Sequence, residues 1–161
     1  MKTFDLSHVC IQVMPGYFKN PAATAETLVE GWCHTGDIGF YDEQGRVFIE
    51  DRKKELIKVK GLQVAPAELE NVLRGLDGVA DVAVVGVPDH RAGELPRAYV
   101  VKKGEQQGLT EEQVKSHVAK ALAPHKQLGG GVEFLGEIPK SAAGKILRKD
   151  LKAAFLKNHA Q

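Results

Sequence analysis

Three segments of the chain contain more polar, basic and glycine residues than the packing of a core requires. The first is His34-Thr35-Gly36-Asp37, which we place between a predicted helix and a predicted strand. The Asp37 carboxylate could accept two hydrogen bonds from the vicinal hydroxyls of a ribose, because both of its oxygens are acceptors. An aspartate in an ordinary turn fits the same pattern, so Thr-Gly-Asp alone is a weak signal.

The second segment is strongly basic. Within nine positions it contains Arg52, Lys53, Lys54, Lys58 and Lys60. Because side chains alternate between the two faces of a strand, Lys58 and Lys60 are predicted to point the same way. Two cations on one face of a hairpin could contact phosphates, although most runs of charge are simply solvated surface.

The third segment, Pro139–Lys145, has a superficial likeness to a phosphate-binding loop. The P-loop pattern requires two glycines at a fixed spacing and a serine or threonine after the lysine. Here Gly136 is too far from Gly144, and Ile146 follows Lys145, which excludes a P-loop ATPase. What remains is a lysine on a loop of small residues just before a helix, where its ammonium group could reach an anion.

Composition narrows the function classes further. The 161 residues carry 22 basic and 21 acidic side chains, a net charge of +1 that argues against a general nucleic-acid-binding protein. No apolar run is long enough to span a bilayer, and residues 1–12 lack the pattern of a secretory signal. Cys10 and Cys33 do not form a paired motif and the six histidines are scattered, so we predict no disulfide framework and no metal site. The C-terminal Asn158–Gln161 is not a Ser-Lys-Leu peroxisomal signal, and we expect a cytoplasmic protein.

The first third of the chain is predicted to form one helix and two strands. Asn20-Pro21 is a typical helix start, and the helix is expected to run to about Val29 and to end at Gly31. Strands are expected at Ile38–Tyr41 and Arg46–Glu50, joined by a loop of hairpin length. We expect residues 1–12 and part of Val13–Glu50 to be loosely held, because both strands would have unpaired edges.

The rest of the chain alternates strands and helices, with a central sheet flanked by helices as the predicted architecture. A hairpin is expected to turn at Lys60-Gly61, and a helix is expected to begin at Pro66. Strands are predicted at Val79–Val87, which is rich in valine, at Ala98–Val101 and at Val132–Leu135. A capping box at Thr110 predicts a helix over Thr110–Leu122, and apolar spacing predicts a final helix after Gly144. The fold class is therefore predicted to be α+β, with a β-rich segment ahead of the compact part.

Taken together and in this order, four segments resemble the adenylate-forming enzymes, which include acyl-CoA synthetases, 4-coumarate–CoA ligases and firefly luciferases. The resembling segments are Val13–Pro21, Gly31–Asp37, Asp51–Glu70 and Pro139–Arg148. The similarity extends from Val13 to the end of the chain. It implies activation of a carboxylic acid by ATP and Mg²⁺ to an acyl-adenylate, with release of pyrophosphate, and in many members transfer of the acyl group to the thiol of coenzyme A.

The resemblance implies roles for individual positions in nucleotide binding and adenylation. Asp37 matches the residue that binds the ribose hydroxyls of AMP, and Arg52 matches an arginine that supports the same nucleotide. Lys145 matches the catalytic lysine, which binds both ATP and the attacking carboxylate during adenylation. Lys53 and Lys54 fall in the hinge between a large N-terminal domain and a small C-terminal lid.

The hairpin positions match residues that act around the second half-reaction. Lys54 and Lys58 match positions near the acyl-adenylate. Lys60 and Gly61 match the hairpin that contacts coenzyme A, and Gln63 is a further candidate on that hairpin. A rotating lid would thus supply Lys145 for one half-reaction and Lys60 for the other.

The domain organisation that follows consists of a non-matching segment 1–12, the tail of an N-terminal adenylation domain over 13–50, a hinge at 51–54 and the lid at 55–161. The phosphate loop, adenine pocket, Mg²⁺ ligands and acyl pocket of the family are not in this sequence, so we expect the N-terminal adenylation domain as a partner and no activity from the chain alone. Three alternatives stay open. The chain could be a non-catalytic fragment that binds a partner or nucleotide, the lid of a luciferase-like oxygenase, or a lid that serves a carrier-protein thiol.

Overall fold

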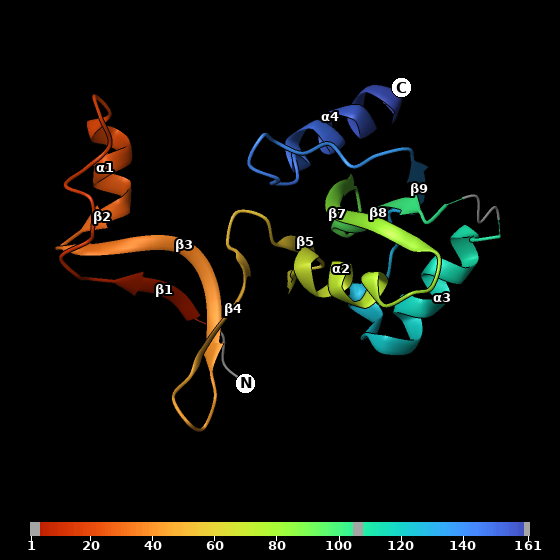
Figure 1. Cartoon of the computed structure of the whole chain (residues 1–161), viewed down its shortest axis with the longest axis horizontal. Coiled ribbons are helices and arrows are strands. Elements are labelled where there is room, and N and C mark those ends of the chain that lie inside the picture. The colour runs from red at the N-terminus through yellow and green to blue at the C-terminus, as the bar shows by residue number, and fades with distance from the viewer. Residues whose placement is uncertain (1–3, 105–107, 160–161) are drawn as a thin grey trace. The chain divides into compact units, whose positions relative to one another are not determined.

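The computed structural model describes residues 4–104 and 108–159 (Figure 1). The chain divides into two compact units, Met1–Lys54 and Glu55–Gln161, which we call unit one and unit two. Unit one contains most of the β-rich segment, and unit two contains the alternating strands and helices. Each unit has its own sheet.

Unit one is built around a long strand, β3 (Trp32–Tyr41). It pairs antiparallel with β1 (Phe4–His8), with the short β2 (Leu28–Val29) and with β4 (Val47–Arg52). Its one helix, α1 (Pro21–Thr27), is capped by the Asn20 side chain, which accepts a hydrogen bond of 3.0 Å from the Ala23 N–H.

Three expectations for unit one were wrong. The helix ends at Thr27 rather than near Val29, because Leu28 and Val29 pair with β3 instead. The strand predicted at Ile38–Tyr41 begins six residues earlier, so Asp37 lies within a strand and not in a turn. The strand also has partners on both sides, since Phe4 pairs with Gly39 on one side and Phe48 pairs with Phe40 on the other.

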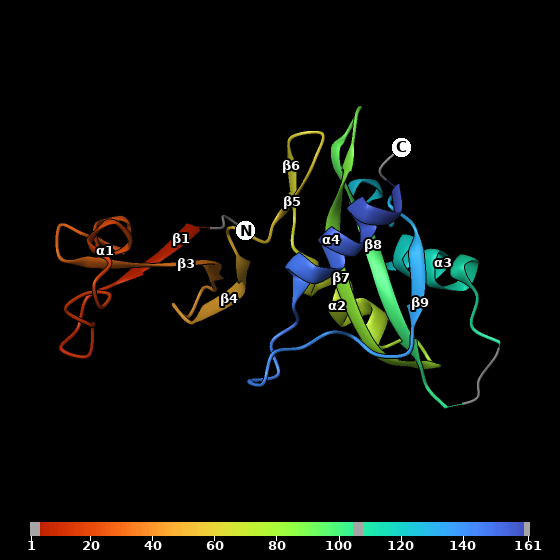
Figure 2. The same ribbon diagram turned by 90° about the horizontal axis from the view of Figure 1, so that it is seen from above.

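Unit two contains a five-stranded sheet in the order β6-β5-β8-β7, with β9 parallel to β8 (Figure 2). The strands are β5 (Ile57–Val59), β6 (Leu62–Val64), β7 (Val79–Asp89), β8 (Gly93–Lys102) and β9 (Val132–Leu135). The helices are α2 (Pro66–Arg74), α3 (Glu111–Ala121), the 3₁₀ turn η1 (Pro124–Lys126) and α4 (Arg148–His159). The predicted hairpins, helices and capping box are all present, and the α+β fold class is confirmed.

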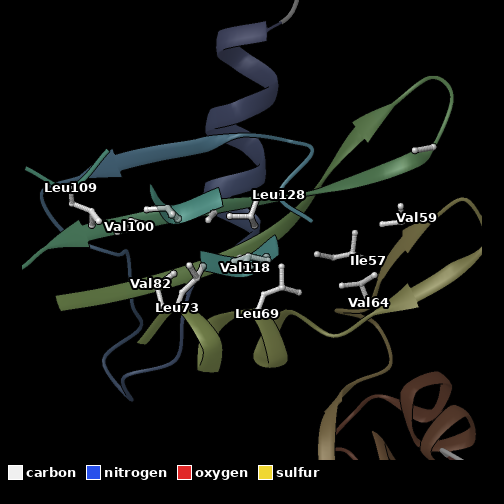
Figure 3. Close-up of a cluster of buried hydrophobic side chains, with 14 residues drawn as sticks. Ile57, Val59, Val64, Leu69, Leu73, Val82, Val100, Leu109, Val118 and Leu128 are labelled. Atoms are coloured by element: carbon white, nitrogen blue, oxygen red, sulfur yellow. The ribbon is translucent and has the colours of Figure 1, made fainter. Parts of the chain in front are cut away.

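Helices cover both faces of this sheet, because alternate residues of the long strands point in opposite directions. On one face, Val82 and Val100 pack with Leu69 and Leu73 of α2 and with Val118 of α3 (Figure 3). On the other face, a second cluster joins the sheet to α4 and consists of Ala83, Val85, Val87, Tyr99, Ile138 and Leu151. The loop Pro139–Lys145, which we call the Lys145 loop, lies between Ile138 and Ile146. Both of these residues pack on this cluster, so both ends of the loop are held to the sheet.

Within the described residues, no helix combines the length and apolar character needed to cross a membrane.

Candidate functional site

The candidate nucleotide-binding pair lies in unit one, on neighbouring strands. Asp37 and Arg52 are opposite each other in the β3–β4 ladder, and the Arg52 Nε forms an ion pair with Asp37 Oδ1 at 2.8 Å. The Asp37 side chain is 19% exposed and that of Arg52 is 60% exposed. The sheet thus places a hydrogen-bond acceptor and a cationic donor side by side, a pair that is chemically able to bind hydroxyl groups and a phosphate.

The segment predicted as a hinge begins as a strand, since Asp51 and Arg52 belong to β4. The Lys53 N–H then donates to the Gly36 carbonyl at 2.8 Å, next to Asp37. The ammonium groups of Lys53 and Lys54 form ion pairs within unit one, with Asp5 at 2.5 Å and with Glu26 at 3.2 Å. Both pairs are largely exposed, and exposed pairs contribute little stability, so neither lysine is firmly held.

The β5–β6 hairpin presents its polar residues through a tight turn. Lys60 and Gly61 have φ angles of 50° and 82°, the pattern of a two-residue type I′ turn. Lys58 lies directly opposite Gln63, and both side chains are exposed, whereas Val59 is buried. Lys60 is part of the turn rather than of the strand, so its direction is set by the left-handed backbone and not by the strand alternation expected from the sequence.

Lys145 lies on a loop that is closed by its own hydrogen bonds. The Lys145 carbonyl accepts from the Ser141 N–H at 2.8 Å, and the Lys145 N–H donates to Ser141 Oγ at 3.2 Å. Gly144 makes the turn possible with a φ of 76°, in the region that favours glycine. The Lys145 side chain is exposed, and over residues 4–104 and 108–159 its ammonium group has no hydrogen-bond or ion-pair partner. The loop therefore presents an available cation on a preformed backbone.

Figure 2 shows the loop that precedes α4 and the β5–β6 hairpin extending in different directions from unit two. The structure brings Asp37 together with Arg52, and Lys58 together with Gln63, whereas no hydrogen bond or ion pair between described residues joins Lys145 to the hairpin. Among the described residues, no group of three or more histidine, cysteine or acidic side chains could hold a metal ion.

The charged residues that hold α4 in place were not predicted from the sequence. Glu70 is 3% exposed, accepts from the Val84 N–H at 2.9 Å and pairs with Arg148 at 2.6 Å. Arg148 also pairs with Glu55 at 2.6 Å. Burial alone would lower the pKa of Arg148, but the two carboxylates outweigh burial and raise it above its usual value. The available signal was Glu70 itself, a charged residue next to Leu69 on the side of α2 that faces the core.

A second missed carboxylate is Glu94 on β8. Its two oxygens accept from the Lys58 backbone N–H at 3.0 Å and from the Lys152 ammonium at 2.9 Å. Burial opposes ionisation, yet these hydrogen bonds hold the pKa of Glu94 below its usual value. Glu94 thereby connects the hairpin of Lys58 to α4.

The chain is similar to AMP-binding enzymes in each of the comparisons with known proteins. Residues 68–145 match the AMP-binding enzyme C-terminal domain. The chain is 56% identical over 143 residues to a putative acyl-coenzyme A synthetase of Emericella nidulans, covering 87% of this chain and 26% of that protein. It is 52% identical over 149 residues to 4-coumarate–CoA ligase 1 of Arabidopsis thaliana, covering 90% and 26%. It is also 48% identical over 158 residues to luciferin 4-monooxygenase of Luciola mingrelica, covering 95% and 28%.

A solved structure shows the same fold. It is o-succinylbenzoate–CoA synthetase of Bacillus subtilis in complex with its acyl-adenylate intermediate, with a TM-score of 0.86 at 30% identity, covering 94% of this chain and 30% of that one. The chain thus spans about a quarter of the length of the curated relatives that it matches.

Proposed function

Because this chain contains a C-terminal domain of the AMP-binding enzyme family, we propose that it serves as the C-terminal part of an ATP-dependent carboxylate–CoA ligase. The observation that carries the proposal is the Lys145 loop, which presents an available ammonium group on a hydrogen-bonded backbone at the end of the matched domain. The first reaction would form an acyl-adenylate and pyrophosphate. The second would transfer the acyl group to the thiol of coenzyme A and release AMP.

Lys145 would act in the first half-reaction. Adenylation brings an anionic carboxylate against the α-phosphate of ATP, which is also anionic, so the two reactants repel each other. An ammonium group between them would stabilise the charge that develops as the carboxylate oxygen attacks phosphorus and pyrophosphate leaves. A flexible point charge suffices here, because neither partner has to be held in a bidentate geometry.

Asp37 and Arg52 would hold the nucleotide during both half-reactions. The Asp37 carboxylate would accept hydrogen bonds from the ribose hydroxyls, and the Arg52 guanidinium group, 2.8 Å away, would fix the orientation of that carboxylate. ATP and AMP are therefore the nucleotides proposed for the site. Mg²⁺ would accompany ATP with ligands outside the described residues of this chain.

The β5–β6 hairpin would act in the second half-reaction. Lys58 and Lys60 are exposed, and neither has an ion-pair partner among the described residues, so both charges are available to an anionic ligand such as coenzyme A. Gly61 has no side chain, so its position in the turn is open to a ligand. Gln63 adds an amide group opposite Lys58. Lys54, which is also exposed, would lie near the acyl-adenylate.

A change of orientation between the two units would exchange these two sets of groups at one reaction centre. We place the hinge at 51–54, between an N-terminal-domain tail at 13–50 and the lid at 55–161. The division of the chain after Lys54 supports this placement. Excluding water during each half-reaction would protect the reactive adenylate from hydrolysis.

The proposed partner is an N-terminal adenylation domain of the same family, in the cytoplasm. Unit one exposes a set of large apolar side chains on β3 and β4, namely Trp32, Tyr41, Val47, Phe48 and Ile49. Tyr41 pairs with Val47, so these two residues and Ile49 lie on one face of the β3–β4 ladder. Exposed apolar residues that share a face typically mark a surface that binds another protein or domain. A partner that covers this surface would also stabilise unit one.

A second candidate function is the lid of a luciferase-like oxygenase, which the likeness to a luciferin 4-monooxygenase favours. It shares the adenylation step and would differ in the second one, where O₂ would oxidise the acyl group of the adenylate, whereas a CoA ligase transfers that acyl group to a thiol. The identity of the acid is set by a pocket outside this chain.

The test is a chimera in which this chain replaces the matching segment of Arabidopsis 4-coumarate–CoA ligase 1. Pyrophosphate release with 4-coumarate measures adenylation, and thioester formation is measured separately. We expect both reactions in the chimera and neither from this chain alone. Adenylation without thioester formation would favour the luciferase-like alternative. A folded chimera without either activity would indicate a non-catalytic binding fragment and contradict the proposal.

A further inference from the structure

The β5–β6 hairpin is joined to the rest of its sheet by few backbone contacts. Only Val59 pairs with a residue of β8, namely Gly93, and the Lys60 N–H donates to the Ala92 carbonyl at 2.7 Å. Continuing this antiparallel register would pair Lys58 with Glu94. The Lys58 N–H instead donates to the Glu94 side chain at 3.0 Å, so a carboxylate replaces a carbonyl of the ladder.

The Glu94 carboxylate is itself held in place from α4 and from β7. Its second oxygen accepts from the Lys152 ammonium at 2.9 Å, and its side chain is 27% exposed. It lies over Gly86, where an added Cβ would come within 2.9 Å of Glu94 Oε2 and 3.0 Å of Ile57 Cγ2. The absence of a side chain at Gly86 thus leaves room for the carboxylate beneath the hairpin.

Helix α4 is therefore connected both to the Lys145 loop, which directly precedes it, and to the β5–β6 hairpin. Arg148 at its start follows Lys145 by three residues and pairs with Glu70 and Glu55. Lys152, one turn later, reaches the hairpin through Glu94. The two connections use different carboxylates, so one can be removed without the other.

We propose that Glu94 is a positioning residue for the thioester half-reaction. By accepting from the Lys58 N–H and from Lys152, it fixes the β5–β6 hairpin against α4, and so sets where Lys58, Lys60 and Gly61 meet coenzyme A. This inference rests on the function proposed above. Glu94 does not touch the substrate in this account, and its effect is transmitted through the backbone of Lys58.

The first test uses this chain alone and does not depend on activity. Amide hydrogen exchange is measured at Lys58 and Lys60 in the parent and in Glu94→Ala. We expect exchange at both positions to become faster by about tenfold or more, because a hydrogen bond to a charged acceptor is lost. Exchange at Val84, in the sheet core, should not change. Unchanged exchange at Lys58 would overturn the proposal.

The second test measures the two half-reactions in the chimera. Glu94→Ala should slow thioester formation by about tenfold while adenylation stays within about twofold, since only the hairpin is displaced. Glu94→Gln keeps an oxygen for the Lys58 N–H and should restore much of the rate, and Lys152→Met should give an intermediate loss. The matched control is Lys115→Met, which removes a similarly exposed ion pair within α3 and should change neither rate.

The outcomes separate this inference from the proposed function. If Glu94→Ala slows adenylation and thioester formation equally, or slows neither, Glu94 is not a positioning residue for transfer. If the parent chimera forms no thioester, the proposed function fails, and the exchange experiment alone decides whether Glu94 holds the hairpin.

Discussion

Replacing Arg148 with methionine tests the ion pair that connects the start of α4 to α2. In the native protein, Glu70 is almost fully buried and accepts from Arg148 Nη1 at 2.6 Å and from Arg148 Nη2 at 3.3 Å. Arg148→Met would leave this carboxylate with the Val84 N–H and with Arg74, whose Nη2 is 3.5 Å away. Methionine preserves most of the apolar stem of arginine, so the main change is the loss of charge and hydrogen bonds.

The expected cost follows from the burial of Glu70. Removing one partner of a buried pair destabilises a protein by about 3–5 kcal/mol, because the remaining charge is left uncompensated. Two donors to Glu70 survive, which places this variant at the lower end, about 3 kcal/mol. In a domain of about 100 residues that corresponds to a fall in Tm on the order of 10–20 °C. Since whole domains are stable by about 5–15 kcal/mol, the variant should still fold.

The assay is urea unfolding followed by circular dichroism, in a two-by-two set of variants. The double variant Arg148→Met/Glu70→Gln should recover most of the loss, because it removes the buried charge and keeps a side-chain oxygen that can accept from the Val84 N–H. Arg46→Met, which removes an exposed ion pair in unit one, should leave the unfolding of unit two unchanged. The reasoning is refuted if Arg148→Met costs less than about 1 kcal/mol, or if the double variant is no more stable than the single one.

Three further outcomes are expected. Leu69→Ala removes a side chain with no exposed surface and should lower the free energy of unfolding by about 2–5 kcal/mol in the same assay, while an unchanged midpoint would mean that α2 is not packed as described. Gly61→Val should destabilise the hairpin by about 1–2 kcal/mol. The cost comes from the φ of 82° alone, because the space around Gly61 is open. Gly61→Asn should cost less, and equal costs for the two variants would contradict a left-handed turn. The pKa of Glu94 is lower in the folded state, so its contribution to stability is present above its ordinary pKa of 4.5 and is lost as the pH falls through the folded value. Acid titration of Glu94→Gln should therefore show a shallower loss of stability than the parent.

Local signals in the sequence were enough to predict most elements of unit two. The capping box at Thr110, the Pro66 helix start and the Lys60-Gly61 turn each depend on a few neighbouring residues, and all three are present. The long β3 strand was not predicted, because Gly36 and Asp37 are poor strand formers. Pairing with β1 and β4 imposes the extended conformation on them, and pairing between distant segments is not visible in local patterns.

The candidate site also contains residues that could be predicted from local motifs and residues that depend on distant contacts. Lys145 and the basic hairpin could be singled out because their residue types occur in compact motifs. The partners of Glu70 and Glu94 could not be predicted, since Arg148 and Lys152 are 78 and 58 residues away in the sequence, and only the packing of α4 on the sheet brings them together. Candidate ligand-binding groups can therefore be predicted from compact motifs, whereas the charged groups that hold those motifs in place become visible only in the folded structure.

The most direct test of the account compares two lysine variants of the chimera in separated half-reactions. Single-turnover rates are measured for adenylation and for thioester formation from a presynthesised acyl-adenylate. Lys145→Ala should lower the adenylation rate by about 10²–10³ and leave thioester formation nearly unchanged, because one well-placed donor to the developing charge is lost. Lys60→Ala should do the reverse. If Lys145→Ala slows both half-reactions equally, the lysine has a structural role, and the assignment of one segment to each half-reaction is wrong.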